Sequence, residues 1–170
     1  QTQYLQLLKK NIAYTVDNMS ASSFGIIDVL LVKFLFGLSS VGLYQAGMKF
    51  VSGILPVMQV VSNVFIPRLS KHGGDEYEKT LLVISLLSAI VLSMTFYLLF
   101  DYAVLYLLGE SYKSLLEMSA LFTLIVFLKF STAGFGVLVI TRNLQKERTK
   151  INLSSLILFI ILSFLLSNSF

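Results

Sequence analysis

Long apolar runs separated by short polar segments organise this sequence from end to end. They predict helices at about 12–36, 41–66, 80–100, 116–141 and 151–170. Each run is close to or above the roughly 20 residues that cross the hydrocarbon core of a bilayer as a helix. Runs such as LILFIILSFLL do not alternate apolar with polar residues, as transmembrane β-strands do. The pattern therefore predicts an all-α integral membrane protein with about five transmembrane helices.

The segments between these runs are short and polar. Residues 37–40 predict a tight turn, PRLSKHGGDEYEK and GESYK predict loops, and RNLQKERTK predicts a strongly basic loop. Asp75 followed by Glu78 resembles the capping box that opens a helix, here the one expected at 80–100.

The composition supports a membrane protein, and the motif content argues against most catalytic functions. Hydrophobic residues make up 56% of the 170 residues, and charged residues make up 13%, about half the usual share of a soluble domain. No nucleotide-binding loop, zinc-protease motif or catalytic triad is present, there is no cysteine, and the one histidine lies in a loop. We expect a non-enzymatic chain without metal or cofactor, with no nucleic-acid partner. Because it opens on Gln1 and ends in an apolar run at Phe170, we also expect it to be part of a longer protein.

The charges of the loops predict an orientation. Lysine and arginine gather before the first helix, between the second and third, and between the fourth and fifth, whereas the other two turns hold one lysine between them, Lys113. The positive-inside rule then places the N-terminus and the two basic loops in the cytoplasm.

Polar residues also form stripes inside the apolar runs. At about 100° per residue, one face of the first helix carries Lys10, Asp17, Ala21 and Asp28, and one face of the fourth carries Lys129, Thr132, Ala133 and Gly136. The second helix has the longest stripe: Gly42, Gln45, Ala46, Lys49, Ser52, Gly53, Pro56, Asn63 and Pro67. Stripes in the third and fifth helices are weak, so we expect these two helices to be more peripheral.

An ion at mid-bilayer costs about 2.5–3.5 kcal/mol, so Asp28, Lys49 and Lys129 are expected to face protein or water rather than lipid. Asp28 and Lys49 lie at matched depths on either side of the predicted turn and are expected to pair across it. The sequence leaves open whether that pair is structural or lines a substrate or ion pathway. It also leaves open whether the bend expected at Pro56 is only structural or serves as a hinge. Lys129 has no obvious acid at its depth, which favours a functional role in such a pathway. Asp17 and Asn63 are further pathway candidates. Lys33, near the outer end of its helix, is expected to snorkel to the headgroups and is assigned no function.

Four segments together resemble a known family. They are IIDVLLVKFLFGLSSVGLYQAGMKF, VFIPRLSK, LLGESYKSLLEMSALF and TRNLQKERTKIN. Their order and spacing are similar to those of the oligosaccharide-lipid flippases, the O-antigen and capsule repeat-unit translocases of the multidrug/oligosaccharidyl-lipid/polysaccharide exporter superfamily. The match corresponds to roughly helices seven to eleven of a larger two-lobed bundle. Asp28 and Lys49 match recurrent family positions, whereas Lys129 matches no family motif.

The resemblance implies a transporter that flips undecaprenyl-pyrophosphate-linked oligosaccharide repeat units across the bacterial cytoplasmic membrane. A coupling ion, membrane lipids and the polysaccharide polymerase machinery are the partners it implies. Two other classes stay open: a multidrug/cation antiporter of the same superfamily, and a membrane-embedded polysaccharide polymerase. Acidic residues in the buried sites would favour the antiporter, and a large outer loop would favour the polymerase.

Overall fold

A computed structural model describes residues 2–72, 74–142 and 144–167, and these residues are helical apart from short connections, without any strand. The elements are α1 (Thr2–Ile54), α2 (Pro56–His72), α3 (Asp75–Leu108), the 3₁₀-helix η1 (Glu110–Met118), α4 (Ser119–Thr141) and α5 (Gln145–Ser167). The predicted all-helical fold is confirmed. Four helical stretches are long and apolar enough to cross a membrane: Ser22–Leu69, Asp75–Leu108, Glu110–Thr141 and Lys146–Leu165.

The helix boundaries differ from the sequence-based expectation in several places. Residues 2–36 are helical well before position 12, and the expected turn at 37–40 reduces to Gly37, whose φ of 82° is outside the helical region. The helix expected at 41–66 is not continuous, because α1 ends at Ile54 and α2 begins at Pro56. Proline has no N–H and disfavours the helical conformation in the residue before it, so Leu55 becomes a turn and Pro56 opens the next helix.

The segment GESYK is not a loop but part of η1, in which Tyr112 alone departs from helical angles. Helix α5 begins at Gln145, so much of the expected basic loop is helical, while residues 168–170 of the helix predicted to reach 170 lie outside the described residues. Helix α3 extends beyond 80–100 at both ends. It stops at Gly109, whose φ of 80° ends helical geometry and whose N–H bonds to Leu105 O at 3.2 Å.

The expectation of a capping box at the start of α3 is wrong. The residue before the helix is Gly74, in an extended conformation, and no side chain caps the exposed amides. Asp75, Glu76 and Glu78 still place negative charge in the first turn, where it favours the positive end of the helix dipole.

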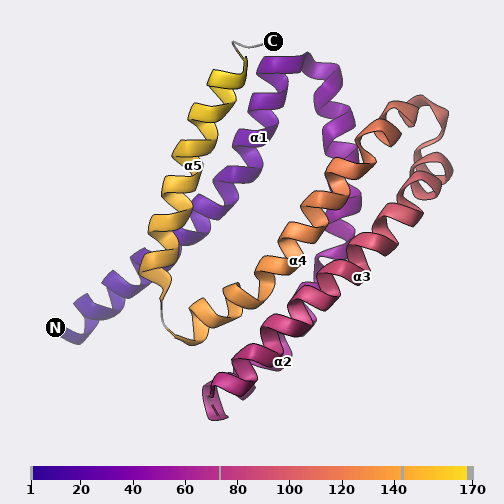
Figure 1. Cartoon of the computed structure of the whole chain (residues 1–170). Helices are drawn as coiled ribbons and strands as arrows, with labels where there is room; N and C mark the ends of the chain where they lie inside the picture. The colour runs from indigo at the N-terminus through magenta and orange to yellow at the C-terminus, as the bar shows by residue number, and fades with distance from the viewer. Residues whose placement is uncertain (1, 73, 143, 168–170) are drawn as a thin grey trace. The chain divides into compact units, whose positions relative to one another are not determined.

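The chain divides into two units, one made of residues 2–41 with α5 and the other of Gly42–Arg142. In the first unit, α5 lies alongside the first part of α1 (Figure 1), and the ring centroids of Phe24 and Phe159 are 6.4 Å apart, those of Phe34 and Phe164 6.3 Å. From the first ring pair to the second, the residue number increases in both helices, so the two helices run in the same direction. That direction agrees with the predicted cytoplasmic start of both.

In the second unit, α3 packs chiefly against α4, and α2 packs against both (Figure 1). The buried face of α3 recurs every three or four residues: Leu81, Ser85, Ala89, Ser93, Phe96, Phe100 and Val104. The facing stripe of α4 is Phe122, Val126, Phe130, Gly134 and Val137. This regular spacing is that of two helices in lengthwise contact. The expectation that the third helix is peripheral is therefore wrong, because α3 supplies the longest buried stripe of this unit.

Candidate functional site

An open cavity of about 740 Å³ lies in the second unit, between the second part of α1 and α3. Its size is within the range of small-molecule sites. The α1 wall consists of Gly42, Gln45, Ala46, Lys49, Phe50, Gly53 and Ile54. Five of these belong to the polar stripe predicted for that helix, so the stripe does line a space rather than packed protein.

Glycine makes room in this wall. A Cβ atom added at Gly42 or at Gly53 would have no neighbour within 4 Å, so both positions open directly onto free volume. Between them, Gly47 faces the other way and lets the helix lie against the Phe122 ring of α4, which would overlap any Cβ at this position. The second part of α1 therefore presents an open face to the cavity and a packed face to the core.

The opposite wall is apolar and aromatic. It is supplied by Leu92, Thr95, Phe96, Leu99, Phe100 and Ala103 of α3, with Leu107, Leu108 and Tyr112 at the end near η1. Phe100 anchors this wall through ring contacts with Phe50 at 5.6 Å, Phe96 at 5.1 Å and Phe122 at 5.7 Å. These contacts join α1, α3 and α4 in an aromatic cluster that forms the floor of the cavity, where its two walls meet, and they hold this floor in place.

Lys49 is the one charged residue in the lining that the structure describes. Its side chain is exposed, and it makes no hydrogen bond or ion pair with the residues of the second unit that the structure describes. An ammonium group beside an apolar wall attracts an anion more strongly than one in open water, because the wall lowers the local dielectric. The arrangement suits an amphiphile with an anionic group at Lys49 and an apolar part against α3.

The structure brings only part of the predicted site together. Lys129 lies on the exposed face of α4, away from the stripe that packs against α3, and does not line the Lys49 cavity. The hydroxyl of its neighbour Thr132 donates to backbone oxygens of Leu128 and Lys129, at 2.9 and 3.1 Å. Asn63 and Pro56 are exposed on α2 and also lie outside this cavity.

Asp28 belongs to the first unit and is half-buried, and its carboxylate accepts a hydrogen bond from the Val29 amide at 2.7 Å. Because Lys49 lies in the other unit, their expected pairing stays a prediction. Asp17 lies on α1, but its side chain falls outside the described residues.

Sequence reasoning missed the α3 wall and Tyr112. The apolar residues of α3 are equally compatible with a lipid-facing surface, and their polar stripe is weak. The spacing of the small residues Ser85, Ala89 and Ser93 indicates where another helix approaches α3 closely. It marks the face that packs against α4, and none of the three residues lines the cavity.

The described residues contain no group of three or more histidine, cysteine, aspartate or glutamate side chains that could hold a metal ion. Searches against protein-family models, curated protein sequences and solved structures find no match to this chain.

Proposed function

We propose that this chain is part of a multi-pass transporter of the bacterial cytoplasmic membrane that moves lipid-linked oligosaccharides, carried on undecaprenyl pyrophosphate, to the outer face. The observation that carries the proposal is the Lys49 cavity. It offers one cation to a phosphate-bearing group and an apolar, aromatic wall to the part of the substrate that stays in the bilayer.

The ends of the second unit support the proposed orientation. Arg68, Lys71, Lys79 and Arg142 lie at the end where α2 and α4 finish and α3 begins. The opposite end carries Asp101, Glu110 and Glu117 with Lys113 alone. The positive-inside rule counts lysine and arginine, so it places the first end in the cytoplasm and the cavity end near Tyr112 toward the outside.

The charge of the cavity also separates this proposal from the cation antiporter of the same superfamily. A site for an organic cation needs a carboxylate, and the lining described here contains Lys49 and no acid. The polymerase alternative receives no support either, because η1 and α4 follow α3 after a single residue and leave no room for a large outer loop there.

The test is a charge substitution in a strain whose surface polysaccharide depends on this protein. Lys49→Gln is expected to leave membrane abundance unchanged and to lower surface polysaccharide about tenfold or more, since a hydrogen bond to a charged group contributes about 1.5–3 kcal/mol. Lipid-linked repeat units should accumulate on the cytoplasmic leaflet, and Lys49→Arg should retain part of the export.

Lys113→Gln is the matched control, because Lys113 is also exposed and lies in η1 next to the cavity residue Tyr112 without lining the cavity itself. It is expected to export normally. Export at the unsubstituted level by Lys49→Gln, at equal abundance, would remove the basis of the proposal.

A further inference from the structure

A second cavity, of about 600 Å³, lies in the first unit between α1 and α5. Its lining is Ile27, Leu30, Leu31, Lys33 and Phe34 from α1 with Ile160 and Phe164 from α5. This groove is separate from the Lys49 cavity and shares no residue with it.

The groove has a polar end and an apolar end. Lys33 lies four residues before Gly37, about 6 Å along the helix axis from the point where helical geometry is interrupted, whereas Ile27 lies about 9 Å deeper. With the chain oriented as proposed, Lys33 is at the level of the outer headgroups and Ile27 is among the acyl chains.

Lys33 has no competing partner among the described residues of its own unit. Its side chain is exposed, and within the described part of that unit it makes no hydrogen bond or ion pair. Every other residue in the groove lining is an aliphatic residue or phenylalanine. A single unpaired cation at the mouth of an apolar groove complements a phosphodiester headgroup whose acyl chain continues into the groove.

We propose that the α1–α5 groove is a binding site for an anionic phospholipid of the outer leaflet, with the phosphate at Lys33 and one acyl chain against Ile27, Leu30 and Ile160. The inference rests on the proposed membrane location and orientation, and is independent of which substrate the transporter carries. A zwitterionic phospholipid offers the same acyl chains but no net charge, so charge is the property that distinguishes the occupant.

The chain contains no tryptophan, which allows a reporter to be placed in the groove. Phe34→Trp puts an indole among the lining residues, and brominated lipids quench its fluorescence on contact. The protein is reconstituted into vesicles that contain either brominated phosphatidylglycerol or brominated phosphatidylcholine, and the signal of the parent protein is subtracted. We expect phosphatidylglycerol to be preferred about fivefold, the effect of one lysine near a membrane surface.

Two substitutions and one control position make the result specific. In the Phe34→Trp background, Lys33→Gln should abolish the preference and Lys33→Arg should keep it. Leu124→Trp, on the exposed face of α4 with no charged residue within one helical turn, should show no preference. Equal quenching by both lipids at Phe34→Trp, an equal preference at Leu124→Trp, or a preference that survives Lys33→Gln would overturn the assignment. Each outcome is read in purified protein, so it is distinct from a failure of the transport proposal.

Discussion

At the scale of single residues, Gly47 sets how closely α1 approaches α4. The Phe122 ring occupies the place of a Cβ at this position, and Phe122 is itself 2% exposed, with Tyr44 packed nearby at a ring distance of 6.5 Å. The close approach is possible only because glycine has no side chain. The helix would otherwise stand further from the aromatic cluster that forms the cavity floor.

Gly47→Ala is therefore expected to destabilise the folded protein by about 1–3 kcal/mol, the usual cost of overpacking a well-packed core. Phe122→Leu in the same chain should recover part of that loss by making space for the methyl group. Thermal unfolding followed by far-UV circular dichroism in detergent measures both effects.

Gly42→Ala and Gly53→Ala are the matched controls, since a Cβ at either position meets nothing within 4 Å. Both should be neutral or stabilising by up to about 1 kcal/mol, because alanine is the better helix former. A Gly47→Ala protein as stable as these controls would contradict the packing described here.

Lys129 raises a different question at this scale, because it is exposed on α4 without lining the Lys49 cavity. An exposed lysine within a 23-residue apolar helix is costly in lipid and is expected to face water or substrate. Lys129→Ala should keep normal membrane abundance but lower surface polysaccharide, while Lys129→Arg should retain part of the export. If Lys129→Ala exports at the unsubstituted level, the residue serves only structure or snorkelling.

At the scale of helices, small residues let α3 and α4 pack closely. A Cβ added at Gly134 would lie 2.7 Å from the Ser85 hydroxyl and 3.2 Å from Leu82 Cδ2. Ser85 is 1% exposed, and its hydroxyl has no hydrogen-bond partner within the described chain, as is also true of the Ser131 hydroxyl. Small size, rather than hydrogen bonding, is thus what Ser85 contributes to this contact.

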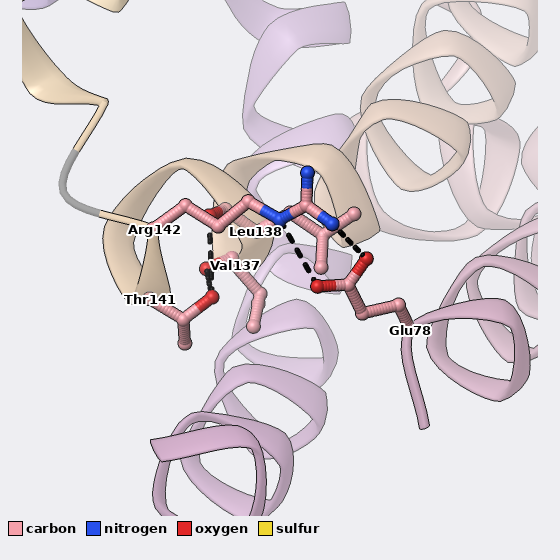
Figure 2. A network of polar contacts seen from close by, with 5 residues as sticks. All are labelled: Glu78, Val137, Leu138, Thr141 and Arg142. Carbon is pink, nitrogen blue, oxygen red and sulfur yellow. Dashed lines mark hydrogen bonds and ion pairs between the residues drawn. The ribbon is translucent and has the colours of Figure 1, made fainter. Parts of the chain in front are cut away.

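An ion pair joins α3 to the end of α4. Figure 2 shows Arg142, just after α4, reaching Glu78 in the first turn of α3 with two parallel hydrogen bonds, Nε to Oε1 at 3.0 Å and Nη2 to Oε2 at 2.5 Å. The Arg142 amide also donates to Leu138 O at 2.9 Å, and the Thr141 hydroxyl bonds to Val137 and Leu138 oxygens (Figure 2). Glu78 is therefore engaged by Arg142 across the helix pair instead of capping its own helix.

Removing this ion pair is expected to lower the stability of the folded protein by a small but measurable amount. Because the side chains are 55% and 22% exposed, Arg142→Gln or Glu78→Gln is expected to lower the free energy of unfolding by about 1 kcal/mol or less. The exchange of both charges, Glu78→Arg with Arg142→Glu, should restore part of the loss. As a control, Lys150→Gln, which breaks an exposed pair within α5, should have no measurable effect. A charge exchange that recovers nothing would mean that the two groups do not interact in solution.

At the scale of the whole molecule, the distribution of basic residues predicts which ends face the cytoplasm. A cysteine introduced at Ser39 or Ser111 should react with an impermeant thiol reagent added to intact cells, and one at Gly74 should react only after the membrane is opened. The chain has no cysteine of its own, so the background is low. Labelling of Gly74→Cys alone from outside would reverse the orientation and would place Lys33 in the inner leaflet.

Local chemistry was enough to predict much of this fold. The lengths of the apolar runs determine that the chain is helical, and Gly37 and Gly109 interrupt helices because their positive φ is readily adopted by glycine. The polar stripe around Lys49 was also readable, because residues 42–53 belong to one helix and their angular positions follow from 3.6 residues per turn.

The tertiary structure decided what those local features contact. Glu78 could cap its own helix or pair with a distant residue, and only the approach of α4 made Arg142 the available partner. Lys49 and Lys129 have the same chemistry and both lie in polar stripes, yet only Lys49 lines the cavity, because its opposite wall comes from α3, some 50 residues away along the chain. A helical period indicates which residues share a face, but the partner of that face is chosen by packing between segments that are distant in sequence.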